Sequence, residues 1–378
     1  MAKGAYMGVD NLARKLKKGY FGVDGIARRI KKAYIGIGGV ARPCWSSGYY
    51  GTITPMNVAH TGRAATTVGN YALFGGGNSG LTYETTVDAY DQSLTHTTPT
   101  ELSVGRTDLA ATTVGNYALF GGGYYYKSGG HYVNTVDAYD QSLTRTAPTT
   151  LSVSREKLTA TTVGNYALFA GGNEGGSMST RSGDVDAYDQ SLTRTTPAEL
   201  NRYRKDLAAT AVGNYALFAG GNDNNDAQTQ FVDAYDQSLT RTAPTTLSVS
   251  RDGLAATTVG NYALFAGGYA SGGAYKTTVD AYDQSLTRTK PTELSVKRYF
   301  LAATTVGNYA LFGGGYGNSN SSYCDTVDAY DQSLTHTIQT ALSVARTRPA
   351  ATTVGNYALF GGGNNSSGRL ATVDVYTA

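Results

Sequence analysis

The sequence predicts an all-β protein built from seven copies of one four-stranded antiparallel sheet. The chain has 378 residues, with 30 Tyr and 48 Gly but only four Met, a balance typical of strands and turns. The heptapeptide Val-Gly-Asn-Tyr-Ala-Leu-Phe occurs seven times, at intervals of 46 to 49 residues. No copy contains an apolar pattern of helical period, which excludes folds that alternate strands with helices.

Each copy predicts four short strands, as the second copy illustrates. Its expected strands are Ala110–Val114, Tyr117–Gly121, Thr135–Asp140 and Leu143–Val153. Gly115-Asn116 predicts a two-residue hairpin turn, because both residues tolerate positive φ, and Asp140-Gln141-Ser142 predicts the next turn. One such sheet cannot bury both of its faces, whereas seven sheets arranged in a closed ring can.

The repeated motif runs from an Arg through Leu-Ala-Ala-Thr-Thr-Val-Gly-Asn-Tyr-Ala-Leu-Phe to a double glycine, and later reaches Val-Asp-Ala-Tyr-Asp. This pattern resembles the kelch family over residues 46–378, and the resemblance implies a seven-bladed kelch-like β-propeller. The chain departs from the family in one respect. It has Thr, for example Thr146, where kelch repeats usually carry a Trp.

The two ends of the chain predict how the ring closes. The last copy supplies only three strands before Ala378, and segment 49–60 matches the fourth strand of the other copies. The resemblance to propellers implies that this N-terminal strand completes the seventh blade. We therefore expect a propeller domain over residues 46–378 and a separate N-terminal module over residues 1–45.

The N-terminal module is basic and repetitive. Residues 1–45 hold ten Lys/Arg and two Asp, giving a charge of +8, whereas the remaining 333 residues sum to −5. A 14-residue repeat starts at Tyr6, Tyr20 and Tyr34, and its turn-forming dipeptides predict three small β-hairpins. Short amphipathic helices are the alternative. The residues expected to make anchoring contacts are Arg14, Lys15, Lys17, Lys18, Arg28, Arg29, Lys31 and Lys32.

Several partners could take such a basic segment. They are a protein assembly, nucleic acid or an anionic membrane, and a solvated linker with no partner is the fourth alternative. The segment resembles N-terminal segments of virion-associated proteins from phages and prophages of Gram-positive gut bacteria. That resemblance implies anchoring to other virion or assembly proteins, and it makes nucleic acid the less favoured partner. We expect neither a signal peptide nor a membrane span, and therefore synthesis in the cytoplasm. The resemblance to virion-associated proteins implies that the protein ends in a virion or extracellular assembly.

The seven copies differ from one another mainly in two segments. These are the loop after the double glycine and the connection that precedes the first strand, and strand alternation puts both at the same end of a blade. The variable segments are rich in Tyr, Gly, Ser and Asn, a composition typical of adaptable binding loops, although drift of surface loops is the alternative. The tyrosines expected to bind ligand are Tyr124, Tyr125, Tyr126, Tyr132, Tyr203, Tyr275, Tyr299 and Tyr323.

An arginine recurs in the connection before each first strand, except in the first copy, which has His60. The kelch resemblance implies a ring of cations near the channel mouth, where they could bind carboxylates or phosphates. The alternative is that each Arg pairs with a framework Asp, such as Asp137, and braces the blades. The six arginines are Arg106, Arg155, Arg204, Arg251, Arg298 and Arg346.

The sequence does not predict an enzyme, and we expect no cofactor and no metal. Copper-radical chemistry, known in some kelch-like propellers, needs paired His ligands, but this chain has four scattered His. His96 and His336 share a register with outer-strand arginines, so we expect both to face solvent. The leading hypothesis is a receptor-binding protein, such as a phage tail fibre or adhesin, whose variable face recognises a host-surface glycan or protein. A structural capsid or tail decoration and a glycan-active enzyme are the alternatives.

Overall fold

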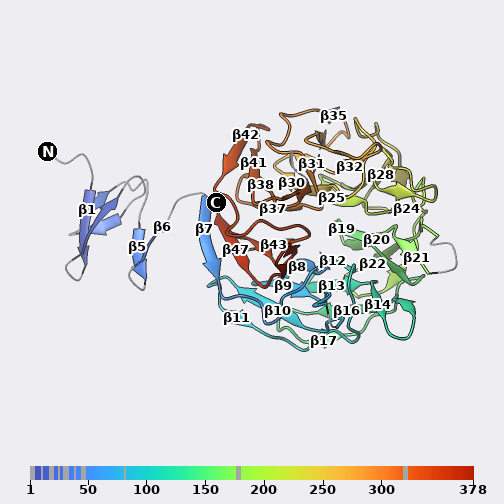
Figure 1. Cartoon of the computed structure of the whole chain (residues 1–378), viewed down its shortest axis with the longest axis horizontal. Helices are drawn as coiled ribbons and strands as arrows, with labels where there is room; N and C mark the ends of the chain where they lie inside the picture. Colours follow the sequence, from blue (N-terminus) through green and yellow to red (C-terminus); the bar gives the residue numbers. More distant parts are fainter. Residues whose placement is uncertain are drawn as a thin grey trace.

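The computed structural model describes residues 48–80, 82–175, 180–317 and 322–378, together with the backbone of six short strands between residues 5 and 43. Within residues 48–378, seven four-stranded antiparallel sheets are arranged as blades around a central channel (Figure 1). This architecture confirms the predicted all-β, kelch-like propeller. Within the described residues, no helix is long and apolar enough to cross a membrane.

The strands of each blade are given from the channel outward. Blade 1 has β8 (Ala64–Val68), β9 (Tyr71–Gly75), β10 (Val87–Asp91) and β11 (His96–Thr97). Blade 2 has β12 (Ala110–Val114), β13 (Tyr117–Gly121), β16 (Val136–Tyr139) and β17 (Arg145–Thr146). Blade 3 has β19 (Thr159–Val163), β20 (Tyr166–Ala170), β22 (Val185–Tyr188) and β23 (Arg194–Thr195). Blade 4 has β25 (Ala208–Val212), β26 (Tyr215–Ala219), β28 (Val232–Tyr235) and β29 (Arg241–Thr242).

The remaining blades follow the same order. Blade 5 has β30 (Ala255–Val259), β31 (Tyr262–Ala266), β34 (Val279–Asp283) and β35 (Arg288–Thr289). Blade 6 has β37 (Ala302–Val306), β38 (Tyr309–Gly313), β41 (Val327–Asp331) and β42 (His336–Gln339). Blade 7 has β43 (Ala350–Val354), β44 (Tyr357–Gly361), β47 (Val373–Thr377) and β7 (Gly48–Ile53).

The hairpin between the first two strands uses only one residue of positive φ. In blade 2, Val114 pairs with Tyr117, and Gly115 between them has φ +52°, whereas Asn116 is not among the residues of positive φ. The predicted two-residue turn is therefore present, and only its first residue uses the positive φ that both residues tolerate. A single positive φ at the first position is the pattern of a type II′ turn, which also suits the strand twist.

The fourth strand is much shorter than the predicted 143–153. In blade 2 it consists only of Arg145 and Thr146, because Leu143 has φ +65° within the turn and Pro148 has no N–H for a ladder. Beyond this strand the chain crosses to the next blade. There Leu151 is buried and the Ser152 N–H donates to Asp186 of blade 3 at 3.0 Å. The expected outer strand thus becomes the connection between blades.

The hydrophobic core lies between neighbouring blades as well as within them. Seven clusters of buried side chains occur among the described residues. One cluster combines Leu73 of blade 1, Leu102 of the connection and Phe120 of blade 2. Each fully buried Leu or Phe contributes about 1.5–3 kcal/mol, so blade-to-blade packing is a main source of stability.

The two ends of the propeller meet in blade 7. Strand β7 pairs antiparallel with β47, with Tyr49 opposite Tyr376 (Figure 1). The Tyr49 hydroxyl also donates to Asp374 at 2.7 Å. The ring is therefore closed by hydrogen bonds between residues far apart in sequence. The closing strand spans Gly48–Ile53 and so overlaps the segment 49–60 named from the sequence only at residues 49–53.

The N-terminal module forms three antiparallel strand pairs. These are β1 (Ala5–Val9) with β2 (Leu12–Leu16), β3 (Phe21–Val23) with β4 (Ile26–Arg28), and β5 (Tyr34–Ile37) with β6 (Val40–Pro43). The backbone thus follows the hairpin interpretation rather than the helical one. The side chains named as anchoring residues, and the turns between these strands, lie outside what the structure describes.

Two adjacent threonines on the first strand of six blades link neighbouring blades around the channel. The Thr113 hydroxyl donates to the Thr67 carbonyl oxygen at 2.6 Å and lies 2.9 Å from the Thr66 hydroxyl. The same pair of hydrogen bonds occurs at five further junctions. At the junction of blades 3 and 4, Ala211 stands in place of the donor threonine.

Replacing Ala211 by Thr should therefore stabilise the propeller. The new hydroxyl is expected to donate to the Thr162 carbonyl oxygen and to contact the Thr161 hydroxyl, adding about 0.5–1.5 kcal/mol to the free energy of unfolding. Urea denaturation measures this change. Ala211→Val is the matched control, because it adds a β-branched side chain without a hydroxyl. Equal stabilisation by Val and Thr would show that the hydroxyl contributes nothing.

Removing strand β7 should destabilise the ring much more than removing the N-terminal module. Deletion of residues 1–47 is expected to leave a cooperative monomer, whereas deletion of residues 1–53 exposes the hydrogen-bonding edge of β47 and favours aggregation. Light scattering and thermal unfolding of the two fragments provide the comparison. A monomeric 54–378 fragment of unchanged melting temperature would contradict the closing role of β7.

Candidate functional site

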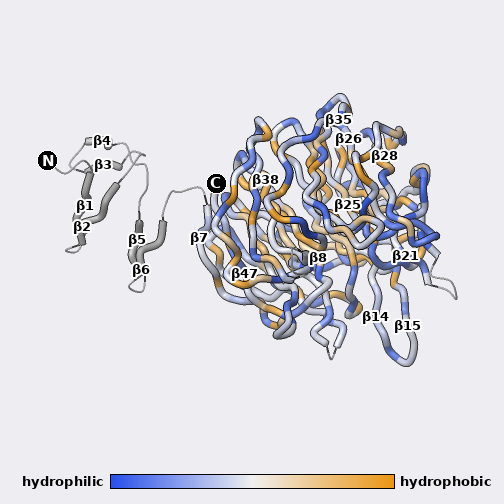
Figure 2. Tube along the Cα trace, turned by 45° about the horizontal axis from the view of Figure 1, so that its top comes forward, coloured by the Kyte–Doolittle hydropathy of each residue, from blue (hydrophilic) through white to orange (hydrophobic). Residues whose placement is uncertain are grey.

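The variable loops and the inter-blade connections meet on one face of the ring, which we call the variable face. Thr107, in the connection before blade 2, bridges to Tyr124 in the loop after the double glycine. In blade 3 the equivalent segments form strands β18 (Arg155–Glu156) and β21 (Asn173–Glu174), and similar pairs occur elsewhere on the face. Figure 2 shows the hairpin of β14 (Tyr124–Tyr126) and β15 (Gly130–Tyr132) projecting from the ring.

The other short strands of this face also come from the variable segments. They are β24 (Arg204–Lys205), β27 (Asn222–Asp223), β32 (Tyr269–Ala270), β33 (Ala274–Tyr275), β36 (Arg298–Tyr299), β39 (Tyr316–Gly317), β40 (Ser322–Tyr323), β45 (Asn364–Asn365) and β46 (Gly368–Arg369). Each pairs with another loop or connection strand rather than with a blade. Loop sequence can therefore vary without disturbing the framework sheets.

The double glycine fixes where each variable loop leaves its blade. Gly122 and Gly123 have φ of +70° and +118°, and a Cβ on Gly122 would lie 2.7 Å from the carbonyl oxygen of Arg155 in the next blade. The Gly123 N–H donates to that same carbonyl at 2.8 Å. Any side chain here would break an inter-blade hydrogen bond, which explains why the doublet recurs in every copy.

One residue from each blade lines the mouth of the central channel. These seven residues, the mouth ring, occupy the position six before the valine of the heptapeptide, and all have φ between +50° and +70°. Backbone hydrogen bonds connect successive members, for example from the Lys157 N–H to the Asp108 carbonyl oxygen at 2.8 Å. The members are Gly62, Asp108, Lys157, Asp206, Gly253, Phe300 and Arg348.

Five of the seven members have side chains despite a backbone conformation that favours glycine. Left-handed φ costs a non-glycine residue about 1 kcal/mol, least for Asp. Gly253 makes both ring hydrogen bonds, from its N–H to the Asp206 carbonyl at 3.0 Å and from the Phe300 N–H to its own carbonyl at 2.8 Å, so glycine can occupy a ring position. The framework alone therefore does not require the Lys157, Phe300 or Arg348 side chains, which points to a role at the mouth.

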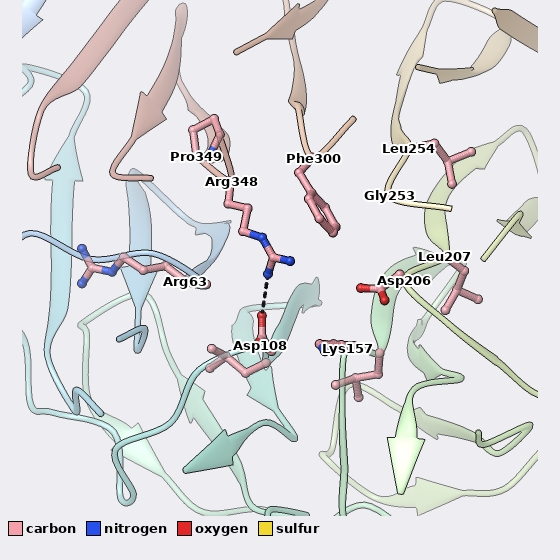
Figure 3. Close-up of a pocket in the computed structure, with 13 residues that line it drawn as sticks. Arg63, Asp108, Lys157, Asp206, Leu207, Gly253, Leu254, Phe300, Arg348 and Pro349 are labelled. Atoms are coloured by element: carbon pink, nitrogen blue, oxygen red, sulfur yellow. Dashed lines mark hydrogen bonds and ion pairs between the residues drawn. The ribbon is translucent and has the colours of Figure 1, made fainter. Parts of the chain in front are cut away.

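The side chains at the mouth form a mixed-charge cluster. Figure 3 shows Arg348 extending across the opening toward Asp108, with a nitrogen–oxygen distance of 3.5 Å. The Arg348 guanidinium also lies 3.9 Å from the centre of the Phe300 ring. Burial raises the pKa of the Asp108 carboxyl, and the charges of Arg348 and Lys157 oppose that shift. The cavity at the mouth has a volume of about 190 Å³.

A larger groove of about 440 Å³ lies beside the mouth, between the loops of blades 1 and 2. Tyr83, Tyr124 and Tyr132 supply its aromatic wall. Its charged lining consists of Asp108, Glu156, Lys157, Arg348 and Arg369, and Thr61, Asn78 and Thr107 add polar groups. The groove thus shares Asp108, Lys157 and Arg348 with the mouth.

The predicted tyrosines do not gather in one site on the variable face. Tyr124 and Tyr132 line the groove, with ring centres 5.4 Å apart. Tyr125 stacks on His131 instead, and Tyr126 is 62 % exposed. In blades 5 and 6, Tyr275 and Tyr299 stack at 5.3 Å, and Tyr316 joins them to Tyr323. Tyr203 stands apart, and its hydroxyl donates to Glu199.

The prediction that the six recurrent arginines bind ligand is wrong for this conformation. All six side chains are fully buried. Each guanidinium pairs with the Asp of its own blade's third strand, as Arg155 does with Asp186 at 2.7 Å. Burial lowers the pKa of the Arg155 guanidinium and the Asp186 charge opposes this shift. The bracing alternative therefore holds, and no ligand in the channel can contact these groups.

Blade 1 reaches the same arrangement from a different position. His60 occupies the register of the recurrent Arg, but Arg63, three residues later, pairs with Asp88 at 2.8 Å. His60 is buried, and its Nε2 lies 3.4 Å from the Thr86 hydroxyl. Burial and the nearby charge of Arg63 lower the pKa of His60 to about 4. His60 is therefore neutral at physiological pH.

The expectation that His96 and His336 face solvent is also wrong. Their Nε2 atoms lie 2.8 Å from Asp88 and 2.7 Å from Asp328, and both rings are largely buried. In four other blades the equivalent outer-strand residue is Arg, which contacts the same carboxylate. The alternation of the short outer strand directs this side chain inward, toward the Asp of the third strand.

Sequence reasoning missed several residues of the groove and mouth. Asp108, Lys157, Phe300 and Arg348 lie in the variable connection, and the αL conformation that aims them at the channel has no signal in one sequence. Asn78 and Arg369 come from loops of different blades and meet only in the fold, where Arg369 donates to the Asn78 carbonyl at 2.8 Å. Within the described residues, no group of three or more His, Cys, Asp or Glu could hold a metal.

Comparisons with known proteins support the fold alone. No family model matches the chain, and no curated protein matches it. Among solved structures, the one titled "Structure of YjhT" matches with a TM-score of 0.61 and 14 % sequence identity. The match covers 76 % of this chain and 99 % of that chain. YjhT is a kelch-repeat protein, and the repeated sheets with their Arg–Asp pairs agree with a kelch propeller.

His60 should make the stability of the propeller depend on pH. Its folded pKa of about 4 lies below the ordinary value of 6.5, so the unfolded chain binds a proton first as the pH falls. The stabilisation is complete above pH 6.5 and is lost progressively toward pH 4, by about 2–3 kcal/mol.

Urea denaturation at pH 7 and pH 4.5 measures this effect against His60→Gln, which cannot take up the proton. The wild-type protein should lose about 2–3 kcal/mol more than the variant between these pH values. Carboxyl groups with a raised pKa, such as Asp252 at about 6, change the free energy of unfolding in the opposite direction as the pH falls. Both proteins contain these groups, so their effect cancels in the comparison. Equal pH dependence in both proteins would contradict a neutral buried His60.

Proposed function

We propose that this protein is a non-enzymatic recognition protein whose variable face binds a ligand on a host cell surface. The observation that carries this proposal is the mouth ring, where five of the seven blades have a non-glycine residue, of four different types, at a position of positive φ. Strained residues that the framework does not need are typical of functional sites. The aromatic and mixed-charge groove beside the ring adds contact area of the kind that binding loops use.

We further propose that the basic N-terminal module anchors the propeller in a larger assembly, such as a phage particle. The module carries +8 whereas the rest of the chain carries −5, so the two parts suit different partners. Three strand pairs in succession supply a repeated backbone for contacts with assembly proteins. The propeller would then present its variable face to the host.

Replacing Tyr124, Tyr125 and Tyr126 together by Ser should weaken binding to host cells while the fold is kept. These residues lie in a loop hairpin outside the blade sheets, and aromatic anchors at an interface contribute about 2 kcal/mol or more, so we expect at least a tenfold loss of affinity. Flow cytometry of the labelled chain on a panel of Gram-positive gut bacteria measures binding, and thermal unfolding checks the fold.

The matched control is Gln141→Ala with Gln190→Ala, on the opposite face. Both side chains are exposed and lie at the constant turns, where each donates a hydrogen bond to a turn Asn, so this variant should bind cells as the wild type does. If neither variant changes cell binding, the propeller is better described as a decoration of the particle. If both weaken it equally, the binding surface is not the variable face.

Fusing residues 1–47 to an unrelated soluble protein should direct that protein to the same particle. Co-sedimentation with purified particles measures attachment, and a fusion of scrambled sequence with the same +8 charge is the control. Specific anchoring should survive about 0.5 M salt, where the Debye length is only a few ångströms. Equal attachment of the scrambled fusion, or loss of attachment in salt with equal binding to bulk DNA, would support simple electrostatic adhesion instead.

A further inference from the structure

The groove beside the channel mouth is built by residues from four blades. Asn78 and Tyr83 come from blade 1, Tyr124 and Tyr132 from blade 2, and Glu156 with Lys157 from the start of blade 3. Blade 7 contributes Arg348 and Arg369. The volume of the groove, about 440 Å³, lies within the range of roughly 300–1,000 Å³ typical of small-ligand sites.

The aromatic wall of the groove is held in place by its own packing. The Tyr124 ring lies edge-to-face with Tyr83, at 6.0 Å, and with Tyr132, at 5.4 Å. The Tyr132 hydroxyl accepts a hydrogen bond from Asn173 at 3.2 Å. A Cβ at Gly130 would lie 2.9 Å from the Tyr124 hydroxyl, so the glycine makes room for this ring. Ordering these rings therefore costs little when a ligand binds.

The charges of the groove alternate in sign and largely pair with one another. Arg348 faces Asp108 at 3.5 Å (Figure 3), and Lys157 faces Glu156 at 3.6 Å. Both distances exceed those of tight ion pairs, which leaves N–H donors and carboxylate acceptors free to contact a ligand. The lining holds three cations and two carboxylates, so its net charge is small and does not select a phosphate or other anion. Its many charged groups disfavour an apolar peptide anchor.

We propose that this groove binds the pyranose ring of a neutral saccharide, which deepens the proposed function by naming the ligand class and its place. Each sugar hydroxyl both donates and accepts hydrogen bonds, so it suits a wall on which cationic donors and carboxylate acceptors alternate. The C–H face of the sugar packs on the Tyr124 ring, in the aromatic wall of the groove. Arg348 and Asp108 contact hydroxyls at the channel end, and Arg369 contacts them at the outer end.

Saturation-transfer NMR of the full chain tests this proposal, with the methyl glycosides of glucose, galactose, mannose and N-acetylglucosamine as probes. At least one glycoside should receive saturation, strongest at the ring C–H protons that face Tyr124. Tyr124→Ala should weaken its binding at least about fivefold, whereas Tyr124→Phe should keep it, because the stacking surface remains.

Tyr126→Ala is the matched control from the same strand, since Tyr126 is exposed and lies outside the groove lining. It should bind the glycoside as the wild type does. If Tyr124→Ala fails to fold, Arg369→Ala at the exposed outer end gives the second comparison and should weaken binding as well.

Two results would overturn the proposal. One is the absence of saturation transfer to any of the four glycosides, and the other is equal transfer to wild type, Tyr124→Ala and Arg369→Ala. If no glycoside binds but the triple tyrosine variant still loses cell binding, the variable face recognises a ligand of another class, such as a protein, and only the saccharide proposal fails. If cell binding is also unchanged, the proposed function fails with it.

Discussion

The propeller depends on one buried carboxylate in the third strand of each blade. In blade 2, Asp137 accepts hydrogen bonds from Arg106 in the entering connection, from Arg145 in the outer strand and from the N–H of Ser103 after blade 1. One group thus ties together the innermost, outermost and preceding parts of the ring. Removing one partner of such a buried pair typically costs about 3–5 kcal/mol, because the other charge is left unpaired.

Blades 1 and 7 keep the buried Asp but pair it with different donors. Blade 1 supplies its inner cation from Arg63 rather than from the recurrent position, and His96 replaces the outer Arg. In blade 7 the outer partner is the hydroxyl of Tyr49, on the strand that comes from the N-terminus. Each solution satisfies the same buried Asp, so the fold tolerates variation wherever a donor can still reach it.

Because the framework is satisfied internally, the variable face is free to differ from blade to blade. Double glycines, inter-blade backbone hydrogen bonds and the threonine pairs along the channel hold the blades together without using loop side chains. Tyrosines and charged residues in the loops therefore have little effect on the stability of the fold. The same logic explains why Phe300 and Arg348 persist in the strained mouth ring, where glycine would satisfy the backbone equally well.

The sequence by itself determined the architecture, the number of repeats and the face that varies, because these follow from local periodicity repeated seven times. It also placed Tyr124 and Tyr132 in a variable loop, since aromatic residues in variable loops are visible without a fold, and their role in binding stays a prediction. Only the tertiary structure decided that the recurrent arginines are buried: a sequence does not show which way a side chain in a connection points or which Asp it meets. The groove could not be predicted from the sequence for the same reason. Arg348 and Asp108 are 240 residues apart, and only closure of the ring and a left-handed backbone at both positions bring them to 3.5 Å.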